Sequence, residues 1–248
     1  NEPNPIDAFV KARLHNCELE LSPEADSATL FRRLSLHLHG MNPSQKAYID
    51  LTDFDHHYNE RVEIFLNSPR YGERWARHWM DIARYADSNG GDFNLTFPES
   101  WRYRNYLIDA FNSDMPYDQF IREQIAGDLL PASGTEERNR QMIATGFLMV
   151  APKMLTERNK PKMHLDIADE QVDTIGRTIM GLTLGCARCH DHKFDPIPTA
   201  DYYAMLGILY STRTADGILM GNVNVSGWKE TDLEVDAKTR QLLAQQET

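Results

Sequence analysis

Apolar residues recur every three or four positions along most of the chain, and this spacing restricts the fold more than any other feature. A short helix is expected from Ile6 to about Leu14, and a long one from about Asp166, whose apolar stripe comprises Val172, Ile175, Ile179 and Leu182. Strand-like alternation is confined to residues 217–225. The periodicity therefore predicts a mainly α fold, a multi-helix domain with irregular loops.

Helix-capping patterns refine the expected boundaries. Asp26–Ser27 and Gly40 have the residue types of an N-cap and a C-terminal stop, and prolines follow N-cap residues at Asn42 and Ser68. Further helices are expected at 100–112, 117–130, 135–149 and 199–209. The polar segment 152–164 contains two prolines, which predicts an exposed connection between helices.

Composition excludes two kinds of partner. The net charge of −11 over 248 residues argues against nucleic acid, whose binding needs Lys and Arg to neutralise phosphates. No apolar run reaches the roughly 18–20 residues that a membrane-spanning helix needs. We therefore expect no nucleic-acid partner and no membrane span.

The segment Cys186-Ala-Arg-Cys189-His190 has the order C-x-x-C-H. Two thiols at this spacing add to the two vinyl groups of one porphyrin, and the adjacent histidine coordinates the iron through a ring nitrogen. The sequence therefore predicts one covalently bound haem c, held by Cys186, Cys189 and His190 near the end of the long helix.

Two other uses of these cysteines stay open. A zinc site needs four ligands, so Cys186, Cys189 and His190 or His192 would require a distant fourth, such as Cys17. A redox-active dithiol of the thioredoxin type occurs in a βαβ setting, whereas this motif follows a helix.

The opposite face of the iron needs its own candidate ligand. His78 is the preferred candidate for metal ligation, because it shares a helix face with Trp75 and Trp79, which could cover a porphyrin. A histidine hydrogen-bonded within the core is the alternative. His192 lies too close to His190 to reach that face and is expected to be exposed or to support His190. Other candidates are Met80, Met154, Met163 and His164.

Three supporting groups can be named. His190 should donate its second ring N–H to an oxygen, and a carbonyl near Pro196 or Pro198 is at a plausible separation. Arg102 and Arg104 could bind the haem propionates, or they could pair with surface carboxylates instead. The acidic loop 87–92 resembles a calcium loop only loosely, because its glycines are out of place for an EF-hand.

Six stretches of the chain have a distinctive sequence: residues 68–88 (SPRYGERWARHWMDIARYADS), 101–105 (WRYRN), 115–120 (MPYDQF), 124–131 (QIAGDLLP), 169–176 (DEQVDTIG) and 186–197 (CARCHDHKFDPI). In these stretches the chain resembles the planctomycete secreted-cytochrome-associated (PSCyt-type) domain of unknown function. The resemblance implies an exported protein in which this domain accompanies other domains of a larger parent protein. We accordingly expect one haem domain over residues 1–212, and a C-terminal extension over 213–248 that leads to a further domain.

The expected function is that of an exported c-type cytochrome that passes electrons to an unknown redox partner protein in a respiratory or degradative system. Haem attachment normally takes place outside the cytoplasm, so a periplasmic or otherwise exported location is expected. One alternative is a haem enzyme with an open distal site for peroxide or an organic substrate. Another is a module without haem whose C-x-x-C-H segment binds zinc.

Overall fold

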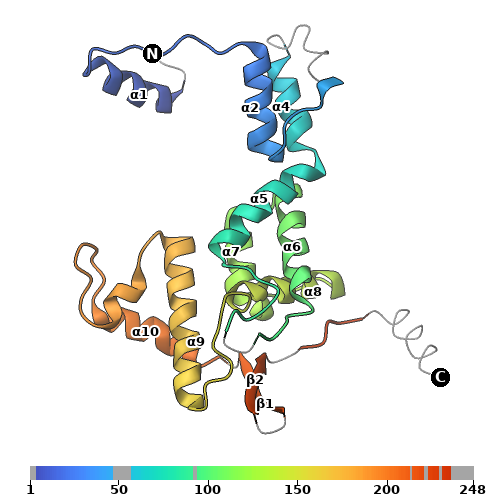
Figure 1. The fold of residues 1–248 in the computed structure, drawn as a ribbon, viewed down its shortest axis with the longest axis vertical. Helices are drawn as coiled ribbons and strands as arrows, with labels where there is room; N and C mark the ends of the chain where they lie inside the picture. The colour runs from blue at the N-terminus through green and yellow to red at the C-terminus, as the bar shows by residue number, and fades with distance from the viewer. Residues whose placement is uncertain are drawn as a thin grey trace, which may run out of the picture. The chain divides into compact units, whose positions relative to one another are not determined.

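A computed structural model describes residues 4–46, 57–91, 94–212, 214–220, 223–228 and 231–235 of the chain. These residues are mainly helical, as the periodicity predicts (Figure 1). The chain divides into two compact units, Asn1–Leu66 and Asn67–Thr248. The boundary expected at residue 212 is a different division, and it stays a prediction.

The described residues of the first unit include the helices α1 (Pro5–His15), α2 (Ser27–His39) and α4 (Tyr58–Leu66). The caps of α2 confirm the sequence pattern. The Asp26 carboxylate accepts a hydrogen bond from the backbone N–H of Thr29 at 2.9 Å, and Gly40 ends the helix in the left-handed conformation. Helices α2 and α4 pack together, and most of the helix expected after Pro43 falls outside the described residues.

The second unit begins with α5 (Pro69–Ile82), α6 (Ser100–Asn112), α7 (Tyr117–Ala126) and α8 (Thr135–Ala144). Two of these helices are shorter than expected, because 3₁₀ turns follow α7 and α8: η1 (Gly127–Leu129) and η2 (Thr145–Leu148). At Gly127 the chain comes very close to α8, since a Cβ atom there would lie 2.0 Å from the carbonyl oxygen of Gln141.

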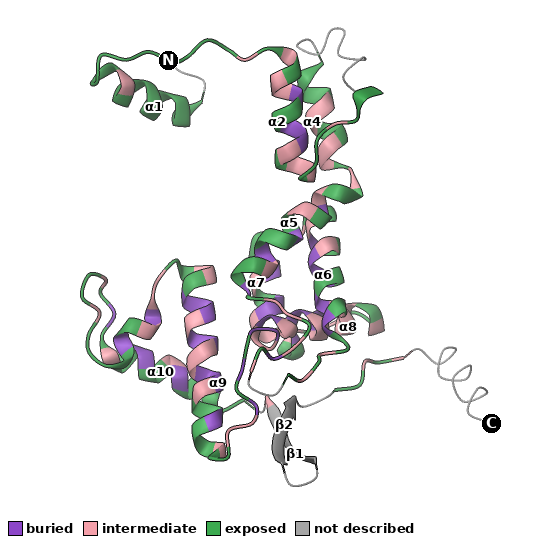
Figure 2. Cartoon of the chain, viewed as in Figure 1, coloured by how far each residue is buried: buried purple, intermediate pink, exposed green. Residues whose placement is uncertain are grey.

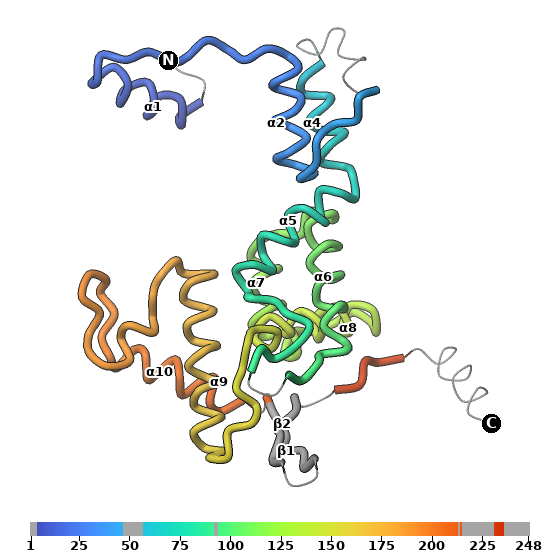
Figure 3. The backbone as a smooth tube through the Cα atoms, in the orientation of Figure 1, coloured from blue at the N-terminus to red at the C-terminus, as the bar shows by residue number. Residues whose placement is uncertain are grey.

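The long helix α9 (Lys160–Ile175) ends well before the cysteines. A π-helical turn, η3 (Gly176–Met180), follows it, and Cys186 lies on a separate 3₁₀ turn, η4 (Leu184–Arg188). The expectation that the helix continues to Cys186 is wrong. Gly181, in the left-handed conformation, ends the helical run. The segment between α9 and α10 (Thr199–Tyr210) forms a long loop (Figure 3).

The expectation of an exposed connection over 152–164 is also wrong. Lys153 and Leu155 are buried, and α9 starts within this segment at Lys160. The Nζ atom of Lys153 lies 2.5 Å from a carboxylate oxygen of Glu170 on α9. Burial lowers the pKa of Lys153, and the Glu170 carboxylate acts in the opposite direction. A polar segment is buried here because its cation has a partner of opposite charge.

Within the second unit, buried residues of α5, α6, α7, α8, α9 and α10 form one continuous core (Figure 2). After α10, strands β1 (Ala215–Met220) and β2 (Val223–Trp228) pair in antiparallel register, in the region where the sequence shows strand-like alternation. Among the described residues, no helix combines the length and the apolar character required to cross a membrane.

The close approach at Gly127 gives a test of this packing. We expect Gly127→Ala to lower the free energy of unfolding by about 1–3 kcal/mol, because the new methyl group meets the backbone of α8. Gly134→Ala is the matched control, since its methyl group would meet no atom within 4 Å. Urea denaturation of both variants measures the difference, and equal stabilities would contradict the packing at Gly127.

Candidate functional site

The C-x-x-C-H segment lies on the surface of the second unit. Cys186 is on η4 and Cys189 directly follows it, and both thiols are exposed and free of disulfides. The side chains of Leu184 and Ala187, by contrast, are buried in the core. The turn is therefore anchored by its apolar residues and presents both cysteine side chains to solvent.

Asp169 on α9 connects this turn to two helices. One of its carboxylate oxygens lies 2.6 Å from a guanidinium nitrogen of Arg188, one of the two residues between the cysteines. The other oxygen accepts a hydrogen bond from the Tyr202 hydroxyl of α10. Tyr203 donates a hydrogen bond to the carbonyl oxygen of Arg188 at 3.1 Å. Burial and the Asp169 carboxylate both raise the pKa of Tyr202, so its hydroxyl stays a donor.

One helical turn further along α9, Asp173 faces the same segment. Its carboxylate accepts a hydrogen bond from Arg177 at 2.8 Å, and a Cβ atom at Gly185 would lie 3.3 Å from it. At Gly176 a Cβ atom would lie 2.7 Å from the side chain of Leu184. The cysteine turn is therefore packed against the C-terminal part of α9.

His190 has one ring nitrogen bound and one free. Its Nδ1 atom lies 2.7 Å from the carbonyl oxygen of Asp191. Because a carbonyl oxygen only accepts, Nδ1 carries the hydrogen, and the lone pair of Nε2 is available to a metal. The expected hydrogen bond to a carbonyl is present, but its acceptor is the neighbouring residue and not a residue near Pro196 or Pro198.

His192 has the opposite arrangement. Its Nδ1 atom accepts a hydrogen bond from the backbone N–H of Asp195 at 2.8 Å, so Nε2 carries the hydrogen and donates to the Thr183 hydroxyl at 3.0 Å. Only 7% of its side chain is exposed. His192 therefore holds the loop together and has no lone pair to offer a metal. Its side chain is not exposed. Among the described residues, no hydrogen bond joins its ring to that of His190.

The uses of the motif differ in the side chains that they need. A tetrahedral zinc site needs four ligands. Across the described residues, no group of three or more His, Cys, Asp or Glu side chains is placed to hold a metal ion. Thioether attachment of a haem needs two accessible thiols and one imidazole with a free nitrogen. Cys186, Cys189 and His190 meet that requirement.

His78 and the tryptophans beside it lie on α5, and none of the described hydrogen bonds or ion pairs joins this helix to the cysteine turn. His78 is exposed, and its ring centre lies 5.4 Å from that of Trp75. The alternative of a histidine bonded within the core is wrong. Trp79 is buried, and its indole N–H donates to Gln124 at 2.8 Å, so it belongs to the core.

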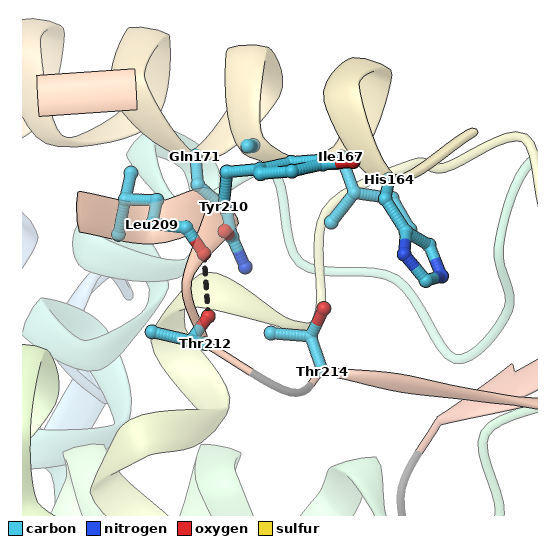
Figure 4. A pocket seen from close by; sticks show the side chains of 8 residues that line it. His164, Ile167, Gln171, Leu209, Tyr210, Thr212 and Thr214 are labelled. Carbon is cyan, nitrogen blue, oxygen red and sulfur yellow. Dashed lines mark hydrogen bonds between the residues drawn. The ribbon is translucent and has the colours of Figure 1, made fainter. Parts of the chain in front are cut away.

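The other distal candidates have separate surroundings. Met163 is fully buried beside Leu155, whereas Met154 is exposed and Met80 packs against the core. His164 lines a cavity of about 200 Å³ between α9 and the residues after α10, together with Gln171, Tyr210 and Thr214 (Figure 4). No hydrogen bond or ion pair of the described residues connects any of these candidates to Cys186 or Cys189.

The two arginines differ in their contacts. Arg102 pairs with Glu99 and lies over the Trp101 ring at 4.6 Å, as expected for a surface arginine. Arg104 is exposed, with the Asp87 carboxylate close enough to interact with its charge. Hydrogen bonds from the hydroxyls of Tyr85 and Ser100 lower the pKa of Asp87. Asp92, the last residue of that loop, lies outside the described residues.

Sequence reasoning missed the role of Asp169 and Tyr202. Asp169 is the first residue of the stretch 169–176, which the resemblance already singles out. Its position one turn before Asp173 puts both carboxylates on one face of α9. Two acidic residues at this spacing, ahead of a basic residue inside the C-x-x-C-H segment, were the available signal.

Because Asp169 accepts two hydrogen bonds, we expect its substitution to lower the stability of the protein more than the loss of an exposed ion pair would. Asp169→Asn should lower the free energy of unfolding by about 1–3 kcal/mol, because Arg188 loses a charged hydrogen-bond acceptor. Asp166→Asn, on the same helix, removes an exposed pair with Lys162 and should cost about 0.5 kcal/mol or less. Urea denaturation compares the two, and equal effects would show that Asp169 is an ordinary surface carboxylate.

Comparison with known proteins gives a family and no relative of known function. A family model described as PSCyt2, protein of unknown function (DUF1549), matches residues 5–214. The curated proteins gave no match, and neither did the solved structures. Since the match extends over most of the chain and includes both the α9 stretch 169–176 and the cysteine turn, this chain belongs to the PSCyt2 family of unknown function.

Proposed function

We propose that this chain is a c-type cytochrome whose haem is attached through Cys186 and Cys189, with His190 as an iron ligand. The observation that carries the proposal is the hydrogen bond of the His190 ring. Its Nδ1 atom lies 2.7 Å from the Asp191 carbonyl oxygen, so the neutral ring carries its hydrogen on Nδ1 and its lone pair on Nε2, in a segment with two exposed free thiols. This is the protonation state that an iron ligand needs.

The residues around the motif would have distinct tasks. A bound haem supplies reversible one-electron transfer at its iron. The Asp191 carbonyl holds the proton on Nδ1 and orients the imidazole. Arg188, held by Asp169, fixes the turn between the two cysteines, and His192 closes the loop behind them through Thr183. The protein therefore presents a preformed attachment site.

Exposure of the turn favours electron transfer as the role. Cys186, Cys189 and His190 are all exposed, so a group attached there would lie near the surface, within reach of a redox partner protein. A substrate-transforming haem enzyme would instead need an enclosed space on the distal side. Because attachment takes place outside the cytoplasm, the proposal includes a periplasmic or otherwise exported location, and it keeps residues 1–212 as the haem domain of a larger parent protein.

The distal ligand is a separate part of the proposal. His78 keeps its place as the candidate, with Trp75 beside it and Arg102 and Arg104 as candidates for the propionates. His78→Ala in the haem-loaded protein should change the spin state of the iron if His78 is a ligand. Carbon monoxide binding to the reduced wild-type protein would instead favour the enzyme alternative with an open distal site.

Attachment of haem is tested directly by the pyridine haemochrome spectrum of protein produced with attachment machinery. The wild-type protein should keep its haem through acid-acetone extraction and show the c-type band. Cys186→Ser with Cys189→Ser should abolish covalent attachment, because both thioether sulfurs are gone. Cys17→Ser, at an exposed cysteine in the other unit, should leave the spectrum unchanged. Wild-type protein that loses its haem on extraction would contradict the proposal.

The two histidines of the loop give a sharper comparison. His190→Ala should shift the absorption spectrum of the loaded protein, because it removes an iron ligand. His192→Ala should leave the ligand spectrum in place and lower the free energy of unfolding by about 1–3 kcal/mol, because backbone N–H groups and the Thr183 hydroxyl lose their buried partner. If His192→Ala alone changed the iron spectrum, the assignment of His190 would be wrong.

A further inference from the structure

A second feature of the same unit includes His78 and Trp75, the candidates named above for the distal side of the haem, and no residue of the cysteine turn. A cavity of about 280 Å³ lies between α5, the end of α6 and the start of α7. Its walls are aromatic: Trp75 and Trp79 come from α5, Phe111 from α6 and Phe120 from α7. None of the residues that line it is Asp, Glu, Lys or Arg.

The walls have the geometry of an aromatic cluster with room for another ring. Trp79 and Phe120 meet edge to face, with ring centres 4.7 Å apart and planes at 71°. Phe111 and Phe120 are tilted by 57° at 5.8 Å. Aromatic rings favour such edge-to-face and offset contacts, so a planar aromatic guest would find both ring faces and ring edges in these walls.

Few polar groups line this cavity: the indole N–H groups of Trp75 and Trp79, the His78 ring and the Tyr117 hydroxyl. The Trp79 indole N–H donates to Gln124 at 2.8 Å and to the Tyr103 hydroxyl at 3.2 Å, so Trp79 offers only carbon surface to a guest. His78, on the lining, makes no hydrogen bond to any residue that the structure describes. Its imidazole therefore presents one donor and one acceptor beside an apolar space.

We propose that this cavity binds a small, uncharged aromatic molecule of one or two rings that carries a single hydroxyl or carbonyl group bonded to His78. The size of the ligand follows from the volume of the cavity, which lies just below the roughly 300–1,000 Å³ typical of ligand pockets. The lack of charge follows from the walls, since an ion would lose its hydration without gaining a partner of opposite charge.

Isothermal titration calorimetry of the full chain with 2-naphthol and with naphthalene tests the proposal. Both should bind, and 2-naphthol should bind about tenfold more tightly because of the hydrogen bond to His78. His78→Phe keeps a ring at this position and removes the hydrogen bond, so it should reduce the affinity for 2-naphthol to that for naphthalene. Unchanged affinity for 2-naphthol in this variant would overturn the role of His78.

Two tryptophans of similar exposure provide the matched control for the site itself. Trp75 is 36% exposed and lines the cavity, whereas Trp101 is 40% exposed and lies outside the lining. Trp75→Ala should weaken both probes at least tenfold, and Trp101→Ala should leave both affinities unchanged. Equal losses in the two variants, or no binding to the wild-type chain, would overturn the proposal, and circular dichroism checks that each variant is folded.

This inference does not depend on the proposed haem. The titration is repeated on the Cys186→Ser, Cys189→Ser double variant, which carries no attached group. Binding of 2-naphthol with equal affinity to this variant and to the loaded protein supports the cavity site, whatever the haemochrome spectrum shows. Binding to the haem-free variant alone would mean that His78 is occupied by iron in the loaded protein, and it would overturn the assignment of His78 to an aromatic ligand.

Discussion

The carboxylate of Asp169 connects the cysteine turn to the two helices beside it, α9 and α10. It accepts hydrogen bonds from Arg188 on the turn and from Tyr202 on α10, while its backbone belongs to α9. A charged acceptor with two donors of this kind restrains each donor more than a neutral acceptor would. Because Arg188 stands between Cys186 and Cys189, this contact helps to hold the segment that carries the two thiols, together with the buried side chains of Leu184 and Ala187.

The residues that follow Asp169 divide between two faces of α9. Asp169 and Asp173, four positions apart, face the cysteine turn, whereas Glu170 and Thr174 are bonded to Arg84 in the segment after α5. A carboxylate oxygen of Asp173 also lies 4.0 Å from a guanidinium nitrogen of Arg84. Side chains four apart lie on one helix face, and adjacent ones do not. This short stretch of helix therefore contacts both the cysteine turn and the segment after α5.

Local signals predicted the local structure well. The cap at Asp26, the stop at Gly40 and the proline start after Ser68 all appear as expected, because each depends on bonds within one turn of helix. The end of α9 at Ile175 was not predictable in that way. The break there accompanies the close packing of Gly176 against Leu184, a tertiary contact. The burial of Lys153 could not be predicted from local sequence either, because its partner Glu170 lies in the next helix.

The sequence does not reveal which of the two histidines of the loop, His190 or His192, keeps a free ring nitrogen. The carbonyl oxygen of Ile197, between the two prolines expected to serve His190, accepts a hydrogen bond from the backbone N–H of His192 at 2.9 Å. The Asp191 carboxylate is likewise bound, to the backbone N–H of Thr199 at 2.8 Å. The loop closes on itself through these bonds, so His190 bonds the carbonyl of its own neighbour. Loop closure thus buries one imidazole and leaves the other with a free nitrogen at the surface, and the motif spacing alone does not reveal which.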